Sequence, residues 1–206
     1  MKVYKLLHDN NHSGDSEKDG FLLKYDGWNL LPYQLIDPKI PVEKLPSQIH
    51  FQANFNVIPK YDYPVTDVGV SVMSVKMYDT LDGIGNVNMD ILPVVMLDDT
   101  YLGGVQTQNG SIKNDVPRLN SYVVVKVKKF LEGVFDYENS DYKMSRRIEG
   151  QIGRIRKIVL RESQIGFPPL FRIAETASTL FISQAAKEAL ESAGIKGCVY
   201  EEIEVS

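Results

Sequence analysis

The stretch PPLFRIAETASTLFISQAAKEALESAGIKGCVYEEIEVS, residues 168–206, decides the expected fold. It predicts a strand over 180–182, a helix over Gln184–Ser192 with Ser183 as its N-cap, and a strand over Cys198–Val205. Gly194 fits the left-handed position after the helix, and Gly197 fits a turn before the last strand. Four apolar side chains recur on one helical face at i, i+3, i+4 and i+7: Ala186, Ala189, Leu190 and Ala193.

The same order of elements occurs earlier in the chain. A buried strand over 68–73 precedes Ser74, which is placed to cap a helix over Val75–Asp82. Gly83 and Gly85 end that helix, and an extended segment over 87–97 follows, in which Pro93 indicates an edge or a bulge. Internal duplication of a strand–helix–strand unit explains the likeness, and so does the common use of serine caps and glycine stops.

The remaining patterns are those of short strands and turns. We expect strands at residues 2–7, 49–58, 122–127 and 158–160. The strand over 49–58 should be buried on one face only, because its apolar residues alternate with polar ones and His50 faces outward. Residues 9–20 are polar and read as a loop, whereas 21–32 are aromatic and include Trp28. Asn109-Gly110 predicts a type I′ hairpin turn.

These elements predict an α+β protein with a mixed, largely antiparallel sheet and a few short helices. We expect residues 1–206 to fold as a single domain, with 1–105 and 119–206 as its candidate sub-units.

Composition narrows the class of protein. The 206 residues are 43% hydrophobic, carry a net charge of −4 and have a pI of about 5.4, which disfavours nucleic-acid binding. The single cysteine, Cys198, allows no internal disulfide, and the first residues lack the apolar run of a signal peptide. No segment approaches a membrane span. These features predict a cytoplasmic protein without a nucleic-acid or membrane partner, as a monomer or weak homodimer.

No residue pattern predicts catalysis or a cofactor. His8 and His12 are spaced i, i+4 but lie in a polar loop, and no cluster supplies the three or four ligands of a metal site. Nucleophile elbows and phosphate-binding loops are not found, and Cys198 reads as a structural thiol. We therefore predict no enzyme, no cofactor and no metal.

Clustered charges leave two interpretations open. Asp98 and Asp99 close a strand, whereas Asp136, Glu138 and Asp141 lie among aromatic residues. Such carboxylates could act in acid–base catalysis or bind a cation. A solvated acidic surface explains them equally well. The basic residues of 146–161 suit phosphate contacts, but pairing with the acidic stretch 132–141 is favoured.

The second half resembles a known family. The similar features are SYVVVKV at 121–127, FDYENSDY at 135–142, KIVL at 157–160, LFRI at 170–173, and LFIS followed by a helix, a glycine and an acidic strand at 180–204. The unit over 68–95 also looks like the family's central region. On these patterns the chain resembles immunity protein family eleven of bacterial polymorphic toxin systems.

The resemblance implies a protein that binds a cognate toxin and neutralises it, without catalytic residues. Leu170, Phe171 and Ile173 should pack in the framework, with Arg172 pairing with a carboxylate. The exposed acidic and aromatic residues are the contact candidates: Asp136, Tyr137, Glu138, Asp141, Asp98, Asp99 and Tyr101. The alternatives are a small enzyme or ligand-binding domain that uses the acidic cluster, and a scaffold that self-associates through the strand 87–97.

Overall fold

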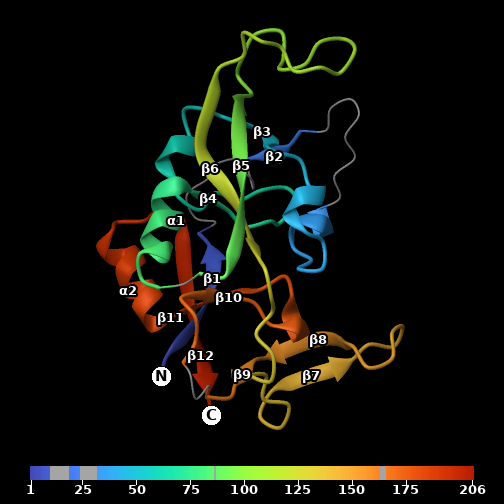
Figure 1. Ribbon diagram of the computed structural model, residues 1–206, viewed down its shortest axis with the longest axis vertical. Helices are drawn as coiled ribbons and strands as arrows, with labels where there is room; N and C mark the ends of the chain where they lie inside the picture. The colour runs from blue at the N-terminus through green and yellow to red at the C-terminus, as the bar shows by residue number, and fades with distance from the viewer. Residues whose placement is uncertain (10–18, 24–31, 86, 163–165) are drawn as a thin grey trace.

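The computed structural model describes residues 1–9, 19–23, 32–85, 87–162 and 166–206 (Figure 1). Within these residues the chain forms two five-stranded sheets, one two-stranded sheet and two α-helices, so the expected α+β class with largely antiparallel pairing is confirmed. The prediction of a polar loop over 9–20 falls mainly outside the described residues, as does Trp28.

The first sheet, called the β1 sheet, is built mainly from the C-terminal part of the chain. Its order is β10-β11-β1-β12-β9, and the pairing is antiparallel except between β12 and β9. The strands are β1 (Val3–His8), β9 (Val159–Leu160), β10 (Leu170–Phe171), β11 (Leu180–Ser183) and β12 (Cys198–Val205). The N-terminal strand thus lies between two strands from the C-terminal end.

The second sheet, called the β6 sheet, has the order β2-β3-β5-β6-β4, with parallel pairing only between β3 and β5. The strands are β2 (Phe21–Leu22), β3 (Ile49–Ala53), β4 (Val72–Ser74), β5 (Met89–Asp98) and β6 (Arg118–Val127). The described residues also form short 3₁₀ turns. Those near this sheet are η1 (Pro32–Leu35), η2 (Val42–Lys44) and η3 (Ile58–Lys60), and η4 spans Ala174–Thr176.

The two predicted strand–helix–strand units share one topology. β4, α1 (Val75–Asp82) and β5 enclose the antiparallel strand β6, and β11, α2 (Gln184–Ser192) and β12 enclose β1 in the same way. A parallel strand, β3 or β9, then flanks β5 or β12. Parallel strands need such a crossover connection, which the helices supply.

The helix boundaries predicted from the caps are confirmed. The Ser74 hydroxyl accepts a hydrogen bond from Met77 N at 3.0 Å, and Ser183 accepts one from Ala186 N at 3.3 Å. Gly194, with φ of 65°, follows the end of α2 as expected. Each helix buries the residues three and seven places after its cap, which are fully inaccessible: Met77, Leu81, Ala186 and Leu190.

One core lies between the two sheets and holds the helices together. Side chains from β1, β11, β4 and β6 join both helices in this cluster, and α1 packs against α2 (Figure 1). The N-terminal strand β1 lies in the sheet of the C-terminal strands, and β6 lies in the sheet of the strands before it. Neither 1–105 nor 119–206 therefore holds a complete sheet. The single domain over 1–206 stays a prediction.

Several local predictions were wrong. The strand predicted over 49–58 ends at Ala53, since Asn54 turns the chain by accepting hydrogen bonds from Val57 N and Ile58 N. His50 is 4% exposed rather than outward-facing, because the loop after β5 buries that face of the sheet together with Val95 and Leu97. The strand predicted over 68–73 forms only at 72–74.

The prediction of an edge or a bulge at Pro93 is confirmed, since among the described residues no strand pairs with its β3 side and a register shift follows it. β5 pairs with β6 through most of its length and with β3 from Val94 onward, and the register shifts between Val94 and Met96. A scaffold that self-associates along this strand would therefore find no free edge over 94–98. The turn at Asn109-Gly110 is not of type I′, because Asn109 has a negative φ and only Gly110 is left-handed, at 84°.

We predict that the two caps differ in their contribution to stability. Ser183→Ala should cost about 1 kcal/mol of unfolding free energy, whereas Ser74→Ala should cost about 2 kcal/mol because its hydroxyl also donates to the Asp62 carboxylate at 2.7 Å. Urea unfolding measures both. Ser192→Ala, at an exposed site in α2, is the control, and equal losses at Ser74 and Ser183 would contradict the prediction.

Candidate functional site

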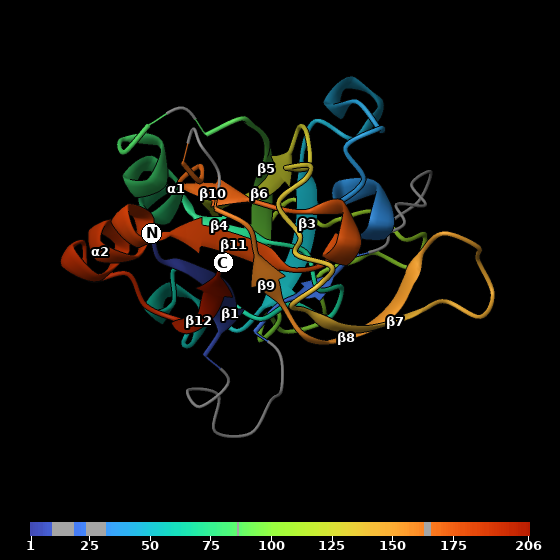
Figure 2. The same cartoon turned by 90° about the horizontal axis from the view of Figure 1, so that it is seen from below.

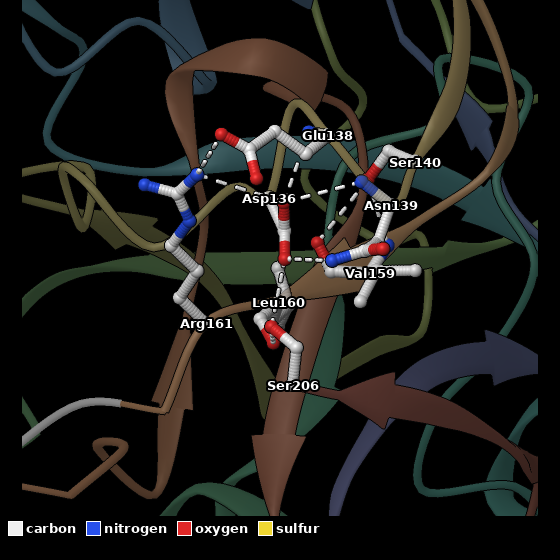
Figure 3. Close-up of polar contacts among 8 residues, drawn as sticks. All are labelled: Asp136, Glu138, Asn139, Ser140, Val159, Leu160, Arg161 and Ser206. Carbon is white, nitrogen blue, oxygen red and sulfur yellow. Dashed lines mark hydrogen bonds and ion pairs between the residues drawn. The ribbon is translucent and has the colours of Figure 1, made fainter.

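Asp136 organises the loop between β6 and β7 (Asp141–Met144). One carboxylate oxygen accepts hydrogen bonds from Glu138 N at 2.9 Å and Asn139 N at 3.2 Å. The other accepts from Asn139 Nδ2 at 2.8 Å and from the Ser206 hydroxyl at 2.7 Å (Figure 3). An aspartate that binds the amides two and three residues onward fixes a tight turn.

The loop is also attached to β9. Asp136 N donates to Val159 O at 2.9 Å, and the Ser140 hydroxyl accepts from Val159 N at 2.9 Å (Figure 3). Phe135 forms a bridge with Leu160 and is 1% exposed. The loop is therefore held by backbone pairing as well as by the carboxylate.

Asp136 is not the exposed contact residue that the sequence suggested. Asp136 is 3% exposed, and the groups that donate hydrogen bonds to its carboxylate all belong to the loop or to Ser206. Hydrogen bonds from Asn139 and Ser206 hold the pKa of this carboxyl well below its usual range, with Arg161 Nη2 3.6 Å away. Reversing the charge of Asp136 would remove these hydrogen bonds, so we expect it to lower the melting temperature.

The neighbouring candidates do lie at the surface. Glu138 is 85% exposed in its side chain and 3.9 Å from Arg161, and Asp141 faces Arg156 at 3.8 Å. Tyr137 is 48% exposed, packs edge-on against Phe135, and donates to Glu175 Oε1 at 2.7 Å. That hydrogen bond raises the pKa of Tyr137 to about 12.

The structure separates the second group of candidates from the first. Asp98 caps the turn after β5 by accepting from Thr100 N at 3.0 Å, and burial raises the pKa of Asp99. The Tyr101 hydroxyl donates to Asp115, which raises the pKa of the tyrosine. The connection between β5 and β6 extends from one end of the molecule, and β7 lies at the other (Figure 1). The seven candidates therefore do not form one surface.

A basic hairpin stands beside the Asp136 loop. β7 pairs with β8 (Ile152–Lys157) in the two-stranded sheet, and we call residues 141–157 the arm. The predicted pairing of basic residues with the acidic stretch is confirmed for Arg156 and Arg161. Arg146, Arg147 and Arg154 are exposed and form no ion pair with any residue that the structure describes.

A groove of about 710 Å³ runs between the arm and the body of the protein. Residues 152–156 of β8 form one wall, and residues 175–180, around η4, form another. Lys5 and His8 from β1 also line it, together with Tyr63 and Ser71. Sequence patterns did not indicate this groove, because its walls come from five separate parts of the chain. The alternation in Gly153-Arg154-Ile155-Arg156 was the available signal for an amphipathic strand.

Behind this groove lies Arg172, which is 2% exposed. It donates to Ala177 O at 2.7 Å and to the Ser71 hydroxyl at 2.7 Å, and burial lowers its pKa. The predicted packing of Leu170, Phe171 and Ile173 is confirmed, since all three are buried. The predicted carboxylate partner of Arg172 is not found among the described residues.

In the described part of the chain, no group of three or more His, Cys, Asp or Glu residues could hold a metal ion. Of the two histidines spaced i, i+4, His12 lies outside the described residues. Burial raises the pKa of the Cys198 thiol to about 12. None of the described helices is both long and apolar enough to span a membrane.

Comparison with protein families relates the C-terminal part of the chain to a known family. Residues 111–205 match the immunity protein family Imm11. This confirms the resemblance predicted from the sequence. The Imm11 segment extends from just before β6 into β12 and so contains the Asp136 loop, the arm and η4, whereas Lys5, His8, Tyr63 and Ser71 lie outside it. No curated protein matches the chain.

We predict that Asp136→Asn removes a pH-dependent part of the stability. A carboxyl whose pKa is lower in the folded state stabilises the protein above its unfolded pKa of about 4, and this contribution is lost as the pH falls further. Thermal unfolding between pH 7 and pH 3 should show a lower melting temperature for the variant at pH 7 and a difference that shrinks toward pH 3.

The control for this measurement is Asp141→Asn, since Asp141 is exposed and only 3.8 Å from an equally exposed arginine. Its melting temperature should follow that of the wild type across the range. A constant difference between Asp136→Asn and the wild type at every pH would show that the ionised carboxylate is not what stabilises the loop.

Proposed function

We propose that this protein binds a cognate bacterial toxin and neutralises it by stoichiometric association, as part of a polymorphic toxin system. The observation that carries the proposal is the match of residues 111–205 to an immunity protein family. The matched segment includes a rigid acidic–aromatic loop and the basic arm beside it. Inhibition would come from covering the toxin's active site or another essential surface, in the cytoplasm and without catalysis.

The contact surface that we propose is centred on the exposed residues of the Asp136 loop. Tyr137 offers a large, partly exposed ring whose orientation is fixed by Phe135, Tyr142 and Glu175. Pre-ordered aromatic side chains with charged neighbours contribute much of the energy in tight interfaces. Glu138 and Asp141 supply the charges, and Asp136 acts as the residue that positions them.

Asp98, Asp99 and Tyr101 stay candidates for a separate second contact. Their distance from the Asp136 loop means that a toxin touching both groups would have to span the long axis of the molecule (Figure 1). The enzyme alternative finds little support in the acidic cluster, because four hydrogen-bond donors already occupy the carboxylate oxygens of Asp136.

Capture followed by neutralisation tests the proposal. The tagged protein is used to isolate partners from lysate of its source cells, and the captured partner's C-terminal region is then expressed in a bacterial host. Co-expression of this protein should restore growth, and the purified pair should form a complex of one-to-one mass. A partner whose expression is harmless, or growth arrest that this protein does not relieve, would contradict the proposal.

We predict that Glu138→Lys combined with Asp141→Lys weakens the complex by tenfold or more, about 1.4 kcal/mol, because opposed rim charges then repel. The melting temperature should change little, since both side chains are exposed. Isothermal titration against the captured partner measures the effect.

The matched control is Glu43→Lys with Asp79→Lys, which changes the net charge equally at exposed positions in η2 and α1. If both double variants lose affinity to the same extent, the effect belongs to net charge and this loop is not the contact.

A further inference from the structure

The arm differs in charge from the rest of the molecule. Its 17 residues hold six Lys or Arg and two Asp or Glu, a formal charge of +4 in a chain whose total is −4. The basic residues are all exposed, and β7 and the turn after it project from the body (Figure 2). A local positive field of this kind attracts acidic partners even when the net charge is negative.

Two of the arm's basic side chains line the groove, together with a lysine from the body of the protein. Arg154 and Arg156 line it from β8, and Lys5 lines it from β1. The two acidic residues of the lining have partners of their own, since Glu201 accepts a hydrogen bond from Lys5 at 2.5 Å and Glu175 accepts one from Tyr137 at 2.7 Å. Arg154 forms no ion pair with the described residues, which leaves the groove with unpaired positive charge.

Arg172 adds to the positive potential from behind. Its guanidinium donates to Ser71 and Ala177, which both line the groove, and no carboxylate of the described residues contacts it. A buried cation without a counter-ion is costly, so an anion brought into the groove would be favoured.

The backbone of β8 faces the same groove. β8 pairs with β7 on one side, and among the described residues no strand pairs with its other side. A free edge offers a row of unpaired N–H and C=O groups to another extended segment. Proteins commonly bind peptides by adding a strand at such an edge, with alternate side chains giving specificity.

We propose that the groove binds an extended acidic segment of a protein partner, which pairs with the free edge of β8 while its carboxylates contact Arg154 and Arg156. The alternation over 154–156 fits this arrangement, since Ile155 packs toward the core and its neighbours Arg154 and Arg156 are exposed. This inference rests on the proposed function in one respect, which is that the protein partner is taken to be the toxin.

The test uses a defined probe rather than the toxin. An eight-residue blocked peptide alternating Glu and Val is labelled and titrated with the full chain, and fluorescence anisotropy gives Kd at low and high salt. The same peptide with Gln for Glu is the neutral control. Arg154→Glu with Arg156→Glu should weaken binding at least tenfold. Lys60→Glu with Lys76→Glu, at exposed sites in η3 and α1, changes the net charge equally and should leave it unchanged.

Hydrogen exchange separates strand addition from charge attraction alone. Bound Glu-Val peptide should slow exchange of amides within 152–157, and a peptide N-methylated at alternate residues should lose both the binding and the protection. Equal binding of the neutral peptide, no protection of β8, or stronger binding of a single-stranded oligonucleotide of similar length would each overturn the inference.

The two proposals fail in different ways. A toxin that is captured and neutralised equally well by Arg154→Glu with Arg156→Glu would overturn the groove as its site and leave the immunity function standing. Peptide binding with the expected variant effects, in a protein that relieves no toxicity, would keep the groove and contradict the immunity function.

Discussion

The carboxylate of Asp62 joins the two helical units, and the rest of the structure depends on this contact. One oxygen accepts the Ser74 hydroxyl at 2.7 Å, and the other accepts Lys196 N at 2.9 Å. The Asp62 backbone accepts Ser74 N and donates to Lys196 O. The start of α1 and the turn before β12 are thereby fixed to the same residue. The two units can then bury their helices in one shared core.

Tyr63, the residue after Asp62, connects this junction to the groove. Tyr63 N also donates to Lys196 O, and the buried Tyr63 ring stacks on His8 at 4.0 Å. Gly197 makes the approach feasible, since a Cβ there would lie 2.9 Å from Tyr63 O and its φ is 91°. Tyr63 and His8 both line the groove, so its inner wall is set by the junction between the units.

How well the sequence predicts each part depends on how local the determining contacts are. A serine cap acts on an amide three residues onward, so the starts of α1 and α2 could be placed from Ser74 and Ser183. Asp136 was predicted to be exposed because one of its hydrogen-bond donors, Ser206, lies 70 residues away in the sequence. The sequence does not distinguish a buried carboxylate from a solvated one. Pro93 was expected at an edge or a bulge because proline lacks an amide donor, and β3 indeed pairs with β5 only from Val94 onward. Its pairing with Val123 of β6 cannot be read from its neighbours in sequence.

Some acidic residues serve the framework of this protein, whereas the arm exposes its basic residues. The sequence does not show this division, so the acidic residues were predicted to contact the partner. Asp62 and Asp136 act inside the fold, where each organises backbone amides at a turn, whereas the arm keeps its arginines exposed. Polar residues that hold a turn and polar residues that bind a partner occur in the same kind of segment, so composition does not distinguish them. The groove itself joins both parts of the chain, because β8 and η4 lie within the Imm11 segment whereas Lys5, His8, Tyr63 and Ser71 lie outside it. A change in those outer residues could therefore alter what the groove accepts while the family's own segment keeps its fold.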